Sequence, residues 1–245
     1  MDNPIYVALS SQMILRRQLE VVANNIANAD TAGFKVETLI TNTDAKPLPN
    51  QDGGPKKINY VLDTGVARDF AQGSLSQTGG ALDVAVEGDG FFKISTARGE
   101  RYTRDGRFAL DAQGKLVTKG GDAVQGDGGD ITIDSTKGEL SIARDGTLSQ
   151  GTTRLGKLDI VSFDDRSGLS KEGGSLYAAK AGSTPQAVPD AVVHQAMVES
   201  SNVQPILQIT NMIEVSRAYE RLSRIIDQTA ELDRQSIGRL GRIAA

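Results

Sequence analysis

Residues 215–232 read VSRAYERLSRIIDQTAEL, and this stretch decides the fold of the C-terminal end of the chain. Small and apolar side chains recur in it at steps of three and four residues, namely Val215, Ala218, Leu222, Ile225, Thr229 and Leu232. Such spacing places them on one side of an α-helix, as in a coiled coil. Charged residues such as Glu220 and Arg224 fall elsewhere on the helix in the favourable i, i+4 order. The pattern predicts one long helix from about Gln204 to about Leu240.

A second amphipathic helix is predicted at the other end of the chain, from about Pro4 to about Ala27. Its apolar stripe again follows steps of three and four residues and includes Ile5, Ala8, Leu9, Leu15, Leu19, Val22, Ala23 and Ile26. The asparagine-rich stretch at its end leads to Gly33, which permits a tight turn. Asn24, Asn25 and Asn28 either cap and turn the chain or contact another subunit, and the sequence leaves both interpretations open.

The middle of the chain differs in composition. All of the 27 glycines except Gly33, Gly238 and Gly241 lie between residues 36 and 195. Residues 36–65 carry Pro and Gly with little periodicity, which predicts an extended connector. After them, short β-prone runs alternate with turns that contain Gly, which predicts strands. The predicted strands are residues 82–86, 92–94, 101–103, 107–110, 115–118, 131–133, 140–142 and 157–163.

These patterns together predict an α+β protein in two parts. We expect residues 1–35 and 196–245 to form a discontinuous helical, coiled-coil domain, because neither helix can bury its apolar stripe alone. We expect residues 66–195 to form an all-β domain that resembles a barrel or a sandwich, joined to the helices by residues 36–65.

Composition argues against several classes of function. The chain has 245 residues, a net charge of −4 and a pI near 5.2, whereas nucleic-acid binding favours a basic surface. It has no cysteine and one histidine, His194, so we predict neither a zinc cluster nor a Cys–His nucleophile. Turns such as Asp105-Gly106 do not follow the spacing of a calcium loop. We expect no enzymatic activity, no cofactor and no metal.

No cleaved signal peptide is expected, because Arg16 and Arg17 interrupt the first apolar pattern. No apolar run reaches the length of about 18 residues that a membrane-spanning helix needs, so we do not expect membrane insertion.

Both ends of the chain resemble signatures of the bacterial flagellar rod and hook proteins. The N-terminal resemblance is carried by Ala23-Asn24-Asn25-Ile26-Ala27-Asn28, Thr31, Gly33, Phe34 and Lys35. The C-terminal resemblance is carried by Glu199-Ser200-Ser201-Asn202-Val203, Thr210-Asn211-Met212-Ile213-Glu214 and Arg217-Ala218-Tyr219-Glu220. The middle is similar to the family in Gly88-Asp89-Gly90-Phe91-Phe92 and Tyr102-Thr103-Arg104-Asp105-Gly106-Arg107-Phe108. The opening residues 1–10 resemble the proximal-rod members of that family most.

The resemblance implies a structural subunit of the flagellar basal-body rod, which polymerises helically into a drive shaft that transmits torque across the periplasm. It also implies export by the flagellar type III apparatus without a cleaved signal peptide. The terminal helices would pack with those of further copies and of other rod proteins. The residues expected at the assembly interface are Leu9, Leu19, Val22, Ile26, Asn24, Asn25, Asn28, Val215, Tyr219, Leu222, Ile225 and Leu232.

Two alternatives stay open at this point. One is a distal-rod member of the same family. The other is a secreted β domain that binds calcium or another ligand, with the helices serving only as an oligomerisation stalk. An ordinary core helix would also show a heptad run as short as the one in residues 215–232.

Overall fold

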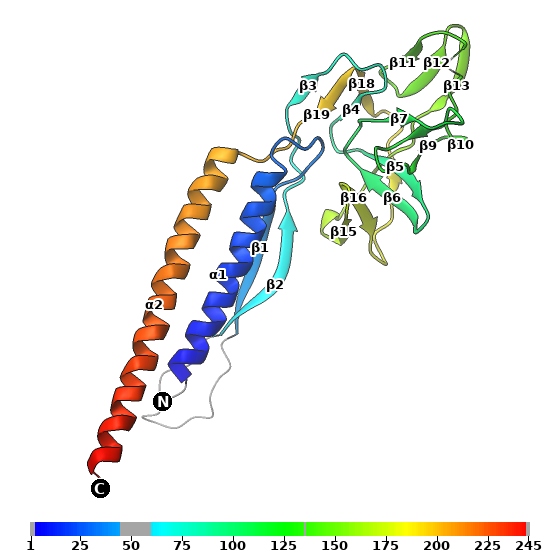
Figure 1. Ribbon diagram of the computed structural model, residues 1–245. Helices are drawn as coiled ribbons and strands as arrows, with labels where there is room; N and C mark the ends of the chain where they lie inside the picture. The colour runs from blue at the N-terminus through cyan, green and yellow to red at the C-terminus, as the bar shows by residue number, and fades with distance from the viewer. Residues whose placement is uncertain (1–2, 45–59, 135, 244–245) are drawn as a thin grey trace. The chain divides into compact units, whose positions relative to one another are not determined.

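The computed structural model describes residues 3–44, 60–134 and 136–243 (Figure 1). The chain divides into two compact units, each of them discontinuous in sequence. The first, named here the helical unit, comprises Met1–Ala27, Glu37–Asp69 and Gln204–Ala245. The second, the β unit, comprises Asn28–Val36 and Phe70–Val203.

Both predicted terminal helices are confirmed, and they form the helical unit's main contact. They are α1, Asn3–Ala27, and α2, Pro205–Ile243. The helices lie side by side and run antiparallel (Figure 1). Gln12 donates a hydrogen bond to Ser223 Oγ at 2.9 Å, and Asn25 donates one to Gln208 Oε1 at 3.2 Å. As the residue number rises along α1, the number of its partner on α2 therefore falls.

An antiparallel hairpin completes the described part of the helical unit. Its strands are β1, Glu37–Asp44, and β2, Tyr60–Arg68. The register shifts between Ile40 and Thr41, beside Gly65, whose φ is +129°. Helix α1 packs against both strands as well as against α2, so it lies between α2 and the hairpin (Figure 1).

The hairpin differs from the extended connector that the sequence predicts for residues 36–65. β-branched and apolar residues such as Thr38, Ile40 and Val66 favour strands, and they lie here in two paired strands. The sequence prediction depended on the Pro and Gly residues between 47 and 55, which lie outside the described residues. The pairing of two strands about 20 residues apart leaves no local signal in the sequence, because it depends on which segments come together in the folded chain.

A ten-stranded sheet forms the larger part of the β unit. Its strands are β5 Phe91–Thr96, β6 Gly99–Thr103, β7 Ala109–Leu110, β8 Leu116–Val117, β9 Ala123–Gly126, β10 Gly129–Asp130, β14 Ile160–Ser162, β15 Leu169–Glu172, β16 Leu176–Ala179 and β17 Gln186–Ala187. The main path runs β15-β16-β6-β5-β9-β8-β7, while β10 pairs with β9 and β14 pairs with both β5 and β17. A short 3₁₀ helix, Arg166–Gly168, precedes β15.

Three smaller sheets complete the β unit. They are the three-stranded sheet β11 Leu140–Ile142, β12 Thr147–Gln150 and β13 Thr153–Lys157, the pair β4 Val84–Glu87 with β18 Val192–Gln195, and the pair β3 Leu75–Gln77 with β19 Met197–Glu199. In the pairs β3–β19 and β4–β18, the chain that leaves the β unit lies antiparallel to the chain that enters it.

Two hydrophobic clusters hold the β unit together. The larger one is mainly aliphatic and includes the fully buried residues Val84, Ile94, Val124 and Leu148. The smaller one is mainly aromatic and is made of Phe70, Phe91, Tyr102, Val161, Phe163, Leu169 and Tyr177. Its rings meet edge to face, a geometry that adds about 0.5–1.5 kcal/mol per pair beyond the burial of their surface. The sheets are thus fixed by packing rather than by long strands.

Most of the predicted strands are confirmed within two or three residues, but the one at residues 131–133 is wrong. Ile131 and Ile133 are buried in the larger cluster although neither belongs to a strand, and the neighbouring pair Gly129–Asp130 forms β10 instead. In the described residues no pairing joins β15 to β7, so the sheet is not the closed barrel that was one of the two predicted architectures. The short strands enclose a hydrophobic core although the sheet does not close into a barrel.

Candidate assembly interface

The residues predicted at the assembly interface differ widely in exposure. Val22, Asn25 and Val215 are buried, Leu19, Ile26, Asn28, Tyr219 and Leu222 are half-buried, and Leu9, Asn24, Ile225 and Leu232 are exposed. The apolar residues of the first two groups are largely covered within the chain. The exposed fractions of Leu9, Ile225 and Leu232 are 47%, 54% and 62%, so these three side chains still present apolar surface to a partner.

The first turns of α2 expose further apolar side chains that the sequence analysis did not assign to the interface. Ile206, Leu207, Ile209 and Ile213 have exposed fractions of 80%, 59%, 47% and 47%. Ile206, Ile209 and Ile213 are spaced i, i+3 and i+7, which places them on one side of the helix. We name these three residues the isoleucine ridge. Their spacing was readable in the sequence, but the heptad run further along the helix gave the stronger signal.

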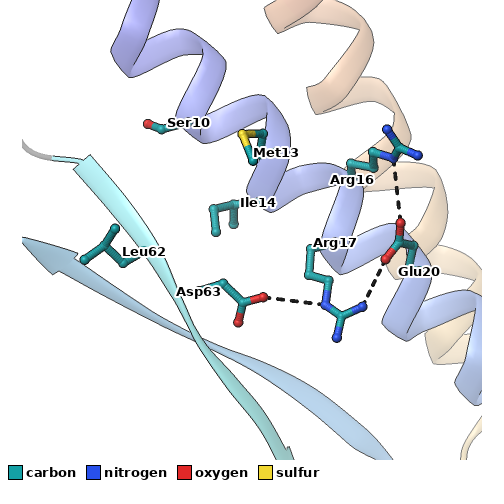
Figure 2. A pocket seen from close by; sticks show the side chains of 8 residues that line it. All are labelled: Ser10, Met13, Ile14, Arg16, Arg17, Glu20, Leu62 and Asp63. Carbon is teal, nitrogen blue, oxygen red and sulfur yellow. Dashed lines mark hydrogen bonds and ion pairs between the residues drawn. The ribbon is translucent and has the colours of Figure 1, made fainter.

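A hollow of about 510 Å³ lies between α1 and β2 in the helical unit (Figure 2). We name it the α1–β2 groove. Its lining residues are Ser10, Met13, Ile14, Arg16, Arg17, Glu20, Leu62 and Asp63. The exposed fractions of Met13 and Leu62 are 65% and 50%, so apolar surface inside the groove is open to solvent.

Charged side chains form one edge of this groove (Figure 2). Arg17 lies between two carboxylates, with Nη1 3.1 Å from Glu20 Oε2 and Nε 3.5 Å from Asp63 Oδ2. Arg16 Nε is 3.7 Å from Glu20 Oε1, and its side chain is 76% exposed. Exposed pairs of this kind contribute about 0–1 kcal/mol each, so they can rearrange at low cost when a partner approaches.

Asn25 connects the end of α1 to the start of the hairpin. It is 1% exposed, its Nδ2 donates to Glu37 O at 2.8 Å, and its Oδ1 accepts from Glu37 N at 2.9 Å. The side-chain amide thus pairs with the Glu37 backbone as a neighbouring strand would. The Asn25 side chain therefore makes contacts within the chain in this structure.

The other two asparagines lie in different surroundings. Asn24 is exposed and donates to Glu37 Oε2 at 3.2 Å. Asn28 belongs to the β unit, where its backbone O accepts from Thr31 N at 3.1 Å and its Oδ1 accepts from Thr31 Oγ1 at 3.2 Å. Asn28 thus takes part in the turn, one of the two interpretations that the sequence leaves open.

Replacing Asn25 by alanine is expected to destabilise the helical unit by about 1–3 kcal/mol, because it leaves the buried backbone groups of Glu37 without their partner. Hydrogen exchange of the Glu37 amide in the purified chain measures this directly, since the amide should exchange about 5- to 150-fold faster. The control is Thr38→Ala, which alters an exposed neighbour in the same strand. Equal exchange in the two variants would contradict the role given to Asn25.

Three charged side chains meet inside the β unit. Lys35 Nζ lies 2.6 Å from Glu199 Oε1, and Arg104 Nη1 lies 3.2 Å from Glu199 Oε2. Each of the three side chains is at most 1% exposed. We name this cluster the charge junction. One carboxylate faces two cations there, and the Arg104 guanidinium also lies over the Phe91 ring, 5.0 Å from its centre.

Further hydrogen bonds support the charge junction. Lys35 Nζ donates to Ala71 O at 2.7 Å, Arg104 Nη2 donates to Gly88 O at 2.6 Å, and Gly73 N donates to Glu199 Oε1 at 2.9 Å. Burial lowers the pKa of Arg104 from its usual value, and the Glu199 carboxylate opposes that shift. Arg104 Nε is buried with no hydrogen-bond partner in the described residues. The buried charges of Lys35, Arg104 and Glu199 are therefore stabilised only while the three parts of the chain that carry them are packed together.

The charge junction brings together the three segments that carry the resemblance described above. Lys35 ends the N-terminal segment, Arg104 lies in the middle segment, and Glu199 begins the C-terminal one. Glu199 O also accepts from Gly33 N at 2.8 Å, and Asn202 Oδ1 accepts from Val36 N at 2.8 Å. These residues are recognisable in the sequence as motif members, but no local pattern predicts that they meet. Their sequence separation, 164 positions between Lys35 and Glu199, left no local signal of contact.

The described residues hold little that suggests reaction chemistry. His194 Nε2 lies 2.8 Å from Glu87 Oε2 in a partly exposed pair between β18 and β4. No group of three His, Cys, Asp or Glu residues that could hold a metal ion is found in residues 3–44, 60–134 and 136–243. Neither helix, over its described length, is long and apolar enough to cross a membrane.

Three family models match parts of the chain. The model described as flagella basal body rod protein matches residues 5–35. The model described as flagellar hook protein FlgE/F/G D1 domain matches residues 85–150. The model described as flagellar basal body rod FlgEFG protein C-terminal matches residues 194–239. Each of the three matched ranges contributes one side chain to the charge junction.

Curated relatives match the chain over nearly its whole length. The flagellar basal-body rod protein FlgF of Caulobacter vibrioides is 51% identical over 245 residues, which covers 99% of this chain and 100% of that protein. FlgF of Mesorhizobium japonicum is 35% identical over 98% of this chain and 99% of that protein. The flagellar basal-body rod protein FlgG of Buchnera aphidicola is 33% identical over 87% of this chain and 90% of that protein.

Proposed function

This chain belongs to the family of flagellar basal-body rod proteins, and from that premise we propose that it is a structural subunit of the rod. Its helical unit polymerises with further copies and with other rod proteins, and the assembled shaft transmits torque. The 51% identity to FlgF of Caulobacter vibrioides exceeds the 33% to FlgG of Buchnera aphidicola and the 35% to FlgG of Agrobacterium fabrum, which favours the proximal part of the rod over the distal part. We assign no catalytic role to any residue.

One observation carries this proposal: α2 buries only part of its apolar surface within its own chain. Helix α1 packs against both α2 and the hairpin, whereas α1 is the main partner of α2 in the described residues. Four apolar side chains in the first three turns of α2, and Ile225 and Leu232 further on, remain exposed. A soluble monomer rarely exposes such a row, and its burial between copies provides the driving force for assembly.

We also propose roles for individual residues of the two helices and a description of the architecture. Leu9, Ile225 and Leu232 contact neighbouring subunits, while Leu19, Val22, Val215 and Leu222 keep α1 and α2 in the shape that a neighbour recognises. The antiparallel pairing and the heptad run support a coiled-coil description of the helical unit. Its bounds, Met1–Ala27, Glu37–Asp69 and Gln204–Ala245, differ from the predicted residues 1–35 and 196–245, because the hairpin joins the helices and residues 28–36 and 196–203 pack in the β unit. The two hydrophobic clusters support a sandwich-like description of the β region.

Location and export also belong to the proposal. The subunit is exported by the flagellar type III apparatus and takes its place in the rod on the periplasmic side. The support for this is the family membership.

Electron microscopy of basal bodies tests the proposed function. Basal bodies from a strain that lacks this chain are expected to have a rod that stops short, and expression of the unmodified chain should restore it. A rod of normal length in the deletion strain would contradict the proposal.

Replacing Leu222 by aspartate is expected to abolish rod assembly while leaving the β unit folded. Leu222 is half-buried in the helical unit, so the aspartate should lower the free energy of unfolding of the free subunit by about 1–2 kcal/mol. Burial of its carboxylate between assembled subunits costs several kcal/mol. Immunoblots of purified basal bodies and motility in soft agar measure the outcome. The matched control is Arg221→Asp, which places the same carboxylate one residue away at an exposed position. Normal incorporation of the Leu222 variant would contradict the assignment of α2.

A further inference from the structure

The isoleucine ridge and the α1–β2 groove belong to different faces of the helical unit. The groove lies where α1 meets β2, on the side of α1 that faces the hairpin. The ridge lies on α2, which packs against α1 and not appreciably against the hairpin. Along the helices, Gln12 meets Ser223 and Asn25 meets Gln208, so Met13 and Ile209 lie at levels about 18 Å apart. The ridge of a chain therefore cannot fill the groove of the same chain.

The ridge and the groove complement each other in shape. Ile206, Ile209 and Ile213 follow the i, i+3, i+7 spacing with which a helix inserts side chains into an apolar groove. The groove offers Met13, Ile14 and Leu62 as apolar lining, and its volume of about 510 Å³ lies in the range of about 300–1,000 Å³ that accommodates whole ligands. It therefore has room for more than one branched side chain.

Their charges are complementary as well. Among residues 205–216, the part of α2 that carries the ridge, the only charged residue is Glu214, which is exposed. On the groove edge Arg17 is held between Glu20 and Asp63, while Arg16 is 76% exposed and only 3.7 Å from Glu20 (Figure 2). Arg16 is thus the cation best placed to turn toward an incoming carboxylate.

We propose that the isoleucine ridge of one copy docks into the α1–β2 groove of a second copy of this chain, with Glu214 of the first beside Arg16 of the second. The contact rests on the proposed function and specifies the surface that serves it. Because the two faces are different, each copy keeps one free ridge or groove after docking. Such a heterologous contact does not close as a dimer, and it extends into an open helical array when the rotation between neighbouring copies does not close a ring.

Cysteine crosslinking in cells tests this contact, and the chain has no native cysteine to interfere. The Met13→Cys/Ile209→Cys variant is expressed in the deletion strain and oxidised, and its basal bodies are analysed on non-reducing gels. A disulfide needs Cα atoms within about 7 Å, so the separation of about 18 Å within one chain excludes an internal bond. We expect a ladder of dimers and higher multiples. Each single variant alone should stay monomeric, and co-expression of the two single variants should give dimers.

The other outcomes separate this inference from the proposed function. If Met13→Cys/Leu232→Cys gives a ladder but Met13→Cys/Ile209→Cys does not, another part of α2 occupies the groove, and the inference is overturned. Dimers from either single variant would indicate a symmetric contact and overturn it too. Absence of any ladder, with the variant present in basal bodies and cells that swim, would overturn the inference while the proposed function stands. Absence of the unmodified chain from basal bodies would overturn both.

A charge reversal gives an independent measurement. In the double-cysteine background, Arg16→Glu and Glu214→Arg should each reduce the crosslinked fraction about two- to fivefold, the range expected for an exposed ion pair. The combination of both should restore it, because the charges are then exchanged across the same contact. Equal crosslinking in all three variants would show that these two residues do not face each other.

Discussion

Replacing Glu199 by alanine is expected to lower the free energy of unfolding of the β unit by about 3–5 kcal/mol, as for other buried ion pairs that lose one partner. Glu199 lies within ion-pair distance of both Lys35 and Arg104. The Arg104 guanidinium cannot give up its proton at ordinary pH. The variant must therefore bury this cation without its Glu199 partner or open the β unit to water.

Urea unfolding of the purified full chain, followed by circular dichroism, measures this loss. The matched control is Glu172→Ala, which also removes a carboxylate that faces two arginines. Glu172 lies about 3.0 Å from Arg101 and from Arg98, but its side chain is 24% exposed and that of Arg98 is 65% exposed. Solvent screens that cluster, so the control should lose about 1 kcal/mol or less. Similar losses in the two variants would contradict the role of the charge junction.

A third variant separates the two cations of the junction. Lys35→Met removes one cation and keeps a side chain of similar length, while Glu199 stays paired with Arg104. The loss should be smaller than for Glu199→Ala, because no unpaired charge remains buried. A larger loss from Lys35→Met would mean that Lys35 and not Arg104 provides the main counter-charge of Glu199.

The second large effect is expected from Gly33→Ala, which should destabilise the β unit by about 2–5 kcal/mol. Gly33 has a φ of +68°, and a side chain there costs about 1–2 kcal/mol in backbone strain alone. An added Cβ would also lie 2.5 Å from the Arg104 carbonyl carbon and from Asp105 N. Backbone atoms cannot move aside as a flexible side chain can, so crowding adds about 1–3 kcal/mol.

The control for backbone strain is Gly79→Ala. Gly79 has a φ of +78°, close to that of Gly33, but a Cβ built on it meets no atom within 4 Å. This control should therefore show the strain alone, about 1–2 kcal/mol, and the difference between the two variants measures the close approach of Gly33 to the middle segment. Thermal unfolding of both purified variants gives that difference, and equal losses would show that crowding at Gly33 is relieved by a shift of the chain.

The limits of sequence reasoning are clearest at the hairpin and at the charge junction. Residues 36–65 were expected to connect the two parts, yet Glu37 pairs with Arg68 across the hairpin and exchanges hydrogen bonds with Asn25. Lys35, Arg104 and Glu199 stood inside recognisable motifs, but nothing in their local sequence indicated that the three would share one buried site. The isoleucine ridge, in contrast, was readable as a helical spacing, and the α1–β2 groove was not, since it is formed by two separate elements.

The local sequence was enough to predict α1, α2 and the strands β4 to β8, β11 and β14, because the side-chain period of a helix or strand and the turn residues between strands act over a few neighbouring positions. It also determined the family, through motifs at both ends and in the middle. Which apolar residues of α1 and α2 are covered and which stay exposed depends on the tertiary structure. It alone brought Lys35 and Glu199 together across 164 positions, since contacts between distant segments depend on how the whole chain packs and not on any local pattern.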